Sequence, residues 1–231
     1  MQYQQPPGDR AAQFPAAFVD LSESEVDQLP DGFVYLDEVL PGIDWDARYA
    51  GPGNFTGDVV DGYAANRIAM AVEMVEPLRA ARDLAREMGY GLLVWDAARP
   101  QRAVDNFVRW AEAPEDGLTK DAHYPNIRKR DMFNLGYVAK RSGHSRGAAI
   151  DLTLIDDETG EPLDMGTGFD FMDELSHHGA KGLTGAQTDN RRTLASIMAD
   201  AGFKRYDNEW WHYSLIKDPH PDEYFDFEIE E

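Results

Sequence analysis

A histidine and an aspartate in one short segment have residue types that can bind a metal ion. His144 lies in the turn Ser142-Gly-His-Ser-Arg-Gly, and Asp151 follows within the largely apolar residues 148–155. Within this run Ile150, Leu152 and Leu154 alternate with Asp151 and Thr153, which predicts a buried or half-buried strand. An unpaired carboxylate is costly on such a strand. A metal ion bound by Asp151 would offset that cost.

A second cluster, Glu209-Trp-Trp-His212-Tyr, places a carboxylate three residues before a histidine. Residues three apart on a regular strand point to opposite faces of the sheet. The two side chains therefore share a site only if Glu209 lies in the turn after Asn208 or at a bulge. The alternative is a sheet edge with exposed polar residues.

The chain contains no cysteine, so any bound metal must use histidine and carboxylate ligands. Two imidazoles and one carboxylate, here His144, Asp151 and His212, form a normal ligand set for a catalytic zinc ion, which keeps a fourth position for water. The sequence has no His-Glu-x-x-His motif that would compete for this role. We therefore expect one zinc ion per chain.

The elements that position these residues mix helices and strands. Apolar residues at helical spacing over 68–88 predict a helix, with Pro77 at its start or at a kink. Further helices are expected over 101–113 and 190–201, and strands over 92–95, 148–155, 203–206 and 210–215. Because helices interrupt strands joined by tight turns, we expect an α+β domain with a mainly antiparallel sheet that is packed with helices and carries the zinc site.

The length of 231 residues and the apolar content of 42% fit one domain with a substantial core. Residues 1–32 are rich in Pro, Gln, Asp and Ser with weak periodicity, which predicts a loosely ordered N-terminal extension. No linker divides the rest of the chain. We expect a single catalytic domain over residues 33–231.

The charge of the chain limits its partners. Forty-three acidic residues against 22 basic ones give a net charge of −21, so the surface should repel nucleic acids and anionic lipids. The acidity itself fits either adaptation to high salt or a margin of solubility. The start of the chain does not resemble a secretion signal, and no run of about 18 apolar residues occurs, which predicts a cytoplasmic protein without a membrane partner. Assembly into a homo-oligomer remains open.

The pattern Ser-x-His-x-x-Gly-x-Ala-x-Asp over residues 142–151, followed by Glu-Trp-Trp-His over residues 209–212, resembles the D-alanyl-D-alanine dipeptidases associated with vancomycin resistance. Flanking segments, from residues 44–50 to residues 224–227, are also similar, so the resemblance covers roughly residues 33–231. The paired motifs are typical of a zinc peptidase superfamily, and the flanking segments indicate its dipeptidase branch.

The resemblance implies that the zinc ligands are His144, Asp151 and His212. It also implies that Glu209 is the catalytic base and that Arg99 stabilises the oxyanion. Without the family pattern, Arg99 would be interpreted as part of a structural salt bridge. The implied reaction is hydrolysis of the small dipeptide D-Ala-D-Ala to two D-alanines.

Three further residues match positions that bind the substrate. Asp170 and Tyr49 are expected to receive its ammonium group, and Ser142 to help hold its carboxylate, although each could instead orient another active-site residue. One position departs from the family pattern, because Ala98 stands before Arg99 where an aromatic residue is usual. We expect this smaller side chain to widen the pocket wall and to loosen the preference for D-Ala-D-Ala.

Two other functions fit part of the pattern. A D,D-carboxypeptidase or related cell-wall peptidase would use the same zinc site, with an export signal and a more open cleft. A zinc-stabilised binding domain would use the metal for structure alone. The presence of both Glu209 and Arg99 favours an enzyme.

Overall fold

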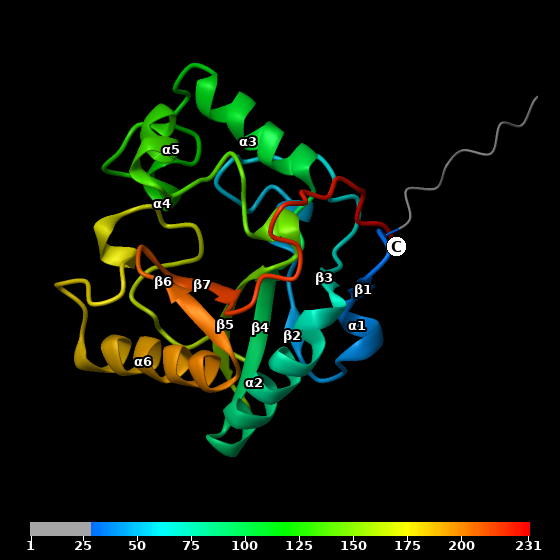
Figure 1. Ribbon diagram of the computed structural model, residues 1–231. Coiled ribbons are helices and arrows are strands. Elements are labelled where there is room, and N and C mark those ends of the chain that lie inside the picture. Colours follow the sequence, from blue (N-terminus) through cyan, green and yellow to red (C-terminus); the bar gives the residue numbers. More distant parts are fainter. Residues whose placement is uncertain (1–28) are drawn as a thin grey trace, which may run out of the picture.

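The computed structural model describes residues 29–231, so most of the predicted extension over residues 1–32 lies outside the described residues. The first element, strand β1 (Phe33–Tyr35), begins at the residue where we expected the folded domain to start. The described part contains six α-helices, seven strands and several short 3-10 turns (Figure 1).

A five-stranded sheet forms the centre of the fold. Its strands, in spatial order, are β2 (Asp44–Trp45), β4 (Tyr90–Asp96), β5 (Ala149–Asp156), β7 (Glu209–Leu215) and β6 (Phe203–Tyr206). Strands β2 and β4 are parallel, and the other neighbours are antiparallel. Strand β1 pairs with β3 (Ala69–Ala71) in a second, antiparallel sheet. The predicted α+β fold with a mainly antiparallel sheet is thereby confirmed.

Two helices pack against this sheet and against each other. Helix α2 (Val75–Glu87) contacts β4, and helix α6 (Gly185–Asp200) contacts β5, β6 and β7. In Figure 1 both lie below the sheet, and the helices above it are α3 (Gln101–Glu112), α4 (Lys120–His123) and α5 (Met132–Leu135). The short helix α1 (Leu36–Val39) follows β1.

The helix expected over residues 68–88 is wrong in its first part. Ala69–Ala71 form β3 because they pair with β1, and Val72–Met74 form the 3-10 turn η2. Alanine has little intrinsic preference for strands, so this strand depends on pairing with a distant segment. Helix α2 begins at Val75, with Pro77 in the first turn, where a missing backbone N–H breaks no hydrogen bond.

The helix expected over residues 190–201 begins earlier, at Gly185. The hydroxyl of Thr184 accepts a hydrogen bond from the backbone N–H of Gln187 at 3.2 Å, and the Gln187 side chain accepts one from the backbone N–H of Thr184 at 2.9 Å. This capping box fixes the start of α6. The other predicted elements agree with the structure to within two residues at each end.

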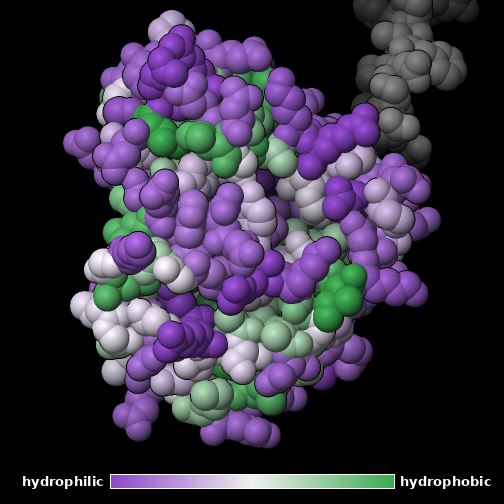
Figure 2. All heavy atoms as spheres, turned by 60° about the vertical axis from the view of Figure 1, so that its left-hand side comes forward, coloured by the Kyte–Doolittle hydropathy of each residue, from purple (hydrophilic) through white to green (hydrophobic). Residues whose placement is uncertain are grey.

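Burial is deepest along the central strands, and seven of the eight residues of β5 are buried. In Figure 2 hydrophilic residues cover most of the visible face, with separate hydrophobic patches between them. None of the helices in the described part is long and apolar enough to cross a membrane.

Candidate metal centre and active site

The two central strands bring two of the predicted metal ligands together. Asp151 on β5 and His212 on β7 are paired directly across the sheet. His144 lies in the 3-10 turn η4 (His144–Arg146), which precedes β5. Gly147 ends this turn with a φ of +67°, and a Cβ there would lie 2.9 Å from neighbouring side chains. The glycine in the motif is therefore required for the tight turn that places His144 beside the strands.

The donor atoms of these three residues converge. His212 Nδ1 lies 2.9 Å from Asp151 Oδ1 and 3.1 Å from His144 Nε2, which lies 3.3 Å from Asp151 Oδ2. Zinc bonds of about 2.0–2.1 Å at tetrahedral angles place neighbouring ligand atoms roughly 3.3 Å apart. The separations therefore fit a zinc ion with three protein ligands. Among residues 29–231 this is the group of histidines and carboxylates that could hold a metal ion.

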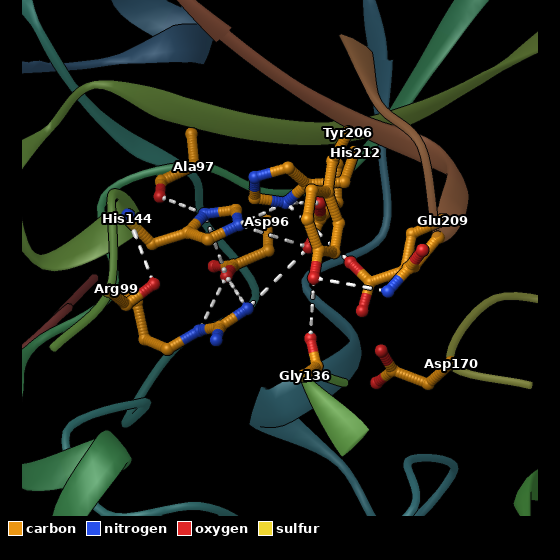
Figure 3. Close-up of polar contacts among 12 residues, drawn as sticks. Asp96, Ala97, Arg99, Gly136, His144, Asp170, Tyr206, Glu209 and His212 are labelled. Carbon is orange, nitrogen blue, oxygen red and sulfur yellow. Dashed lines mark hydrogen bonds and ion pairs between the residues drawn. The ribbon is translucent and has the colours of Figure 1, made fainter. Parts of the chain in front are cut away.

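The tautomer of His144 suits metal binding. Its Nδ1 lies 2.7 Å from the carbonyl oxygen of Ala97, to which it donates, so the lone pair of the neutral ring is on Nε2 (Figure 3). Metal-binding histidines are commonly oriented by such a backbone carbonyl. The backbone N–H of His144 donates to Ser142 Oγ at 3.1 Å, so Ser142 also supports the turn.

The charge states also suit a cation. Burial alone would raise the pKa of Asp151, but the adjacent imidazoles of His144 and His212 lower it below its usual range. Burial lowers the pKa of His212, which favours its neutral form. An ionised carboxylate and a neutral imidazole are the states that bind metals.

An irregular strand pairing brings Glu209 to the same site. Tyr206 of β6 pairs with Glu209, whereas the preceding residue, Arg205, pairs with Tyr213, so the register shifts between them. The sequence required such an irregularity if Glu209 and His212 were to share a site. In the structure Glu209 Oε2 lies 3.9 Å from His212 Nδ1.

Two further buried carboxylates lie near the metal ligands, side by side in Figure 3. Glu209 is 8% exposed and Asp170 is 6% exposed. Burial, followed by the charges of Asp151 and Asp170, raises the pKa of Glu209 well above its usual value. Burial, followed by the charge of Asp151, raises the pKa of Asp170 to about 8. Because Tyr49 Oη donates to Asp170 Oδ2 at 2.8 Å, these two predicted residues form one unit.

A buried network fixes Arg99. Its Nε donates to Asp96 Oδ2 at 2.9 Å, and its Nη2 lies 3.5 Å from Asp151 Oδ2. Asp96 Oδ1 also accepts a hydrogen bond of 2.6 Å from Tyr63 Oη. The sequence analysis missed Asp96, although it follows the apolar residues 92–95 directly. A carboxylate beside a buried strand was the signal that singled out Asp151.

One cavity of about 230 Å³ is lined by all the residues that the sequence analysis assigned to the metal, to catalysis or to the substrate. Its remaining walls are largely aromatic and apolar, and include Phe55, Phe107, Met172 and Trp211. The eight predicted residues that line it are Tyr49, Arg99, Ser142, His144, Asp151, Asp170, Glu209 and His212. The structure thus brings the predicted metal, catalytic and substrate residues together at the sheet.

A family model described as D-Ala-D-Ala dipeptidase matches residues 30–230, which include the whole cavity. The chain belongs to this D-Ala-D-Ala dipeptidase family. Known members are similar over most of their length. The D-alanyl-D-alanine dipeptidase of Enterococcus faecium is 54% identical over 198 residues, which cover 86% of this chain and 98% of that protein.

Other relatives span a range of similarity. The D-alanyl-D-alanine dipeptidase of Streptomyces coelicolor is 56% identical over 85% of this chain and 98% of its own length. The Escherichia coli dipeptidase of the same name is 34% identical over 79% and 83%. A solved structure of the vancomycin-resistance D,D-pentapeptidase VanY with Zn(II) has 17% identity and a TM-score of 0.40, and the match covers 66% of this chain and 76% of that one.

The departure from the family pattern at Ala98 does not have the expected effect. Ala98 is 1% exposed, belongs to the core and is not among the described residues that line the cavity. Its backbone N–H donates to the carbonyl oxygen of Ala69 at 2.8 Å, so its backbone is tied to the small sheet. The prediction of a wider pocket wall is therefore wrong.

The histidines that we did not assign to the metal lie elsewhere. His177 Nε2 contacts Tyr137 Oη at 3.0 Å, and His220 Nδ1 contacts the carbonyl oxygen of Arg146 at 3.1 Å. His123 Nδ1 contacts the carbonyl oxygen of Asp170 at 3.2 Å. His123 therefore supports the segment that carries a predicted substrate-binding residue.

Proposed function

We propose that this chain hydrolyses D-Ala-D-Ala to two D-alanines and uses one zinc ion bound by His144, Asp151 and His212. The observation that carries the proposal is the single small cavity that combines this ligand set with the buried carboxylates of Glu209 and Asp170. The identity of 54% to the E. faecium D-alanyl-D-alanine dipeptidase supports the choice of substrate.

Glu209 is the proposed general base. When bound, zinc would acidify a water molecule and polarise the peptide carbonyl. Glu209 accepts the proton of the attacking water and then transfers it to the leaving amine. Because burial raises the pKa of Glu209, it holds a proton readily enough for the second step. Its position beside His212 places it next to the ligand set.

Arg99 is proposed to stabilise the negative charge that develops on the carbonyl oxygen. Its guanidinium lines the cavity and is held by Asp96, so the charge is oriented before the substrate binds. A fixed donor in a buried site needs little reorganisation in the transition state. Asp96 is thus proposed to act through Arg99.

The two ends of the dipeptide are recognised by different residues in this proposal. The carboxylate of Asp170, which accepts the hydrogen bond from Tyr49, binds the substrate ammonium. Ser142 Oγ accepts the His144 backbone N–H and still has its own O–H to donate to the substrate carboxylate. A buried carboxylate at one end of the cavity favours a free amine over a longer peptide.

The two rival functions explain less of the site. A D,D-carboxypeptidase acts on longer peptides and has no use for a buried carboxylate where the chain continues. A binding domain with structural zinc has no use for Glu209 and Arg99 as polar groups that line a cavity. Cytoplasmic location stays a prediction from the sequence, and assembly into a homo-oligomer stays open.

The test combines metal analysis with a product assay. The purified chain should contain about one zinc per chain and release D-alanine from D-Ala-D-Ala, with much lower kcat/KM for N-acetyl-D-Ala-D-Ala and for a cell-wall pentapeptide. Equal rates on the pentapeptide would favour the carboxypeptidase. Zinc binding without release of D-alanine from any of these substrates would favour the binding domain.

A further inference from the structure

Residues 165–177 form the segment that carries Asp170, and the buried side chain of Arg191 in α6 contacts both ends of this segment. Arg191 is 3% exposed. Its guanidinium donates to two carbonyl oxygens after Asp170, those of Leu175 at 2.9 Å and His177 at 3.1 Å. Before Asp170 it donates to the carbonyl oxygen of Met165 at 2.6 Å. A single guanidinium thus ties together the two arms of the segment.

A second contact reinforces the first arm. Arg191 Nη2 donates to Thr167 Oγ1 at 3.3 Å, and Trp210 Nε1 of β7 donates to the same oxygen at 2.8 Å. Because Trp210 lies next to Glu209 and two residues before His212, this hydroxyl connects the segment to the strand that carries the proposed base.

Arg191 is an unusual choice for this position if packing were its only role. All four of its hydrogen-bond acceptors are uncharged, and within residues 29–231 it forms no ion pair closer than 4.0 Å. Burial lowers its pKa to about 10, against the opposing effect of the charge of Asp164. The guanidinium carbon also lies 5.7 Å from the ring centroid of Trp210, so its near contacts are neutral acceptors and an aromatic ring. A buried charge that lacks a close counter-ion destabilises a fold. The planar guanidinium of arginine, with its five N–H donors, can reach acceptors before and after Asp170 at the same time.

The backbone of this segment adopts an unfavourable conformation at Asp170. Asp170 has a φ of +55° and is the one residue other than glycine with a positive φ in the described part of the chain. Such a conformation is uncommon for a residue other than glycine and persists only when surrounding contacts impose it. At the tip these contacts come from Tyr49 and His123, and at the base they come from Arg191 and from the contact of 3.0 Å between the hydroxyls of Thr167 and Ser176.

We propose that Arg191 is a positioning residue for recognition of the substrate amino group, because it ties the two arms of the segment and thereby aims Asp170 into the cavity. The inference rests on the proposed function in one respect, the binding of the substrate ammonium by Asp170. It assigns a role in specificity to a residue that does not line the active-site cavity.

The test uses the zinc-loaded enzyme and the variant Arg191→Lys, which keeps the positive charge but loses the guanidinium group that donates to both arms. The matched control is Arg192→Lys, because Arg192 is the next residue of α6 and its side chain is 77% exposed. The readouts are the zinc content, KM and kcat for D-Ala-D-Ala, and the inhibition constant of N-acetyl-D-Ala-D-Ala, which lacks the ammonium. Arg191→Lys should raise KM about tenfold or more, as expected when a buried charge contact is misplaced by a small distance. It should leave the zinc content and the inhibition constant unchanged.

Asp170→Asn serves as the reference, and the double variant completes a cycle. If Arg191 acts through Asp170, Arg191→Lys should raise KM far less in the Asp170→Asn background than in the wild type. Additive effects would overturn the inference, as would equal weakening of the free and acetylated dipeptides by Arg191→Lys. Should Asp170→Asn itself leave KM unchanged, the assignment of the ammonium site fails, and this result is distinct from failure of Arg191 alone.

A milder variant guards against misfolding of Arg191→Lys. Thr167→Val removes one acceptor of Arg191, together with the contacts of Trp210 Nε1 and Ser176 Oγ to the same hydroxyl, with little change in volume, and Thr167 is not in the active-site cavity. It should raise KM for the free dipeptide in the same direction by a smaller factor. If Thr167→Val folds and leaves the ratio of KM to the inhibition constant unchanged, the inference is wrong.

Discussion

Replacement of Asp170 by asparagine should selectively weaken the binding of substrates with a free amine. Asparagine has nearly the same shape and tolerates the positive φ of this residue better than most side chains do, so the backbone should be preserved. The change removes only the negative charge that Asp170 offers to the substrate ammonium. It therefore separates recognition from zinc binding and from proton transfer.

The size of the effect follows from burial and pKa. Breaking a buried charge pair costs about 3–5 kcal/mol. Because the pKa of Asp170 is about 8 before the ammonium binds, ionising it at pH 7 costs about 1.4 kcal/mol of this gain. The net loss of about 1.6–3.6 kcal/mol corresponds to roughly 15- to 450-fold in kcat/KM.

The assay measures D-alanine release from D-Ala-D-Ala by Asp170→Asn and by the control Glu174→Gln. Glu174 is an exposed carboxylate in the same segment, so its loss changes the net charge equally. The zinc content of both variants should match that of the wild type. If kcat/KM falls less than about threefold in Asp170→Asn, or equally in the control, the ammonium assignment is refuted.

Three further predictions address the metal, the pH dependence and the turn. His144→Ala and His212→Ala should each lose zinc, as measured by metal analysis after gel filtration, because two protein ligands bind zinc weakly; full retention of metal would contradict the ligand set. Since Asp170 is neutral below its pKa, kcat/KM for D-Ala-D-Ala should fall as the pH decreases below about 8, and this acid limb should become shallower in Asp170→Asn, where only the proposed base Glu209 still titrates. Gly147→Ala should lower the free energy of unfolding by about 1–3 kcal/mol more than Gly160→Ala, because both glycines have a positive φ but only Gly147 lacks room for a Cβ. Equal losses in chemical denaturation would show that crowding at Gly147 is unimportant.

The sequence predicted those parts of the fold and site that depend on local chemistry. Asp151 stood out because a carboxylate on a buried strand requires a partner, and the register shift that Glu209 needs is present between β6 and β7. Strand β3 was missed because its alanines carry no strong local signal and form a strand only by pairing with β1. The effect of Ala98 was misjudged because spacing alone does not show which wall a side chain faces.

Other features depend on contacts between distant segments, which one sequence does not reveal. Asp96 accepts hydrogen bonds from Arg99 and Tyr63, and Tyr63 lies 33 residues away from it in the chain. Arg191 lies in an ordinary helix, and its contacts with the segment around Asp170 depend on the packing of α6. Arg191 carries no motif of its own and is found only from the structure, whereas the position of Asp96 directly after the apolar residues 92–95 was a signal that the sequence analysis did not use.

The most direct test of the central claim measures D-alanine release per bound zinc in Glu209→Gln, beside the exposed control Glu161→Gln. Glutamine keeps the shape of Glu209 but cannot move a proton, and neither change removes a proposed zinc ligand. The proposed mechanism predicts that Glu209→Gln retains about one zinc per chain and loses on the order of 10²-fold or more of kcat on D-Ala-D-Ala, while the control stays close to wild type. Near-normal kcat in zinc-loaded Glu209→Gln would contradict the assignment of Glu209 as the base of a zinc dipeptidase.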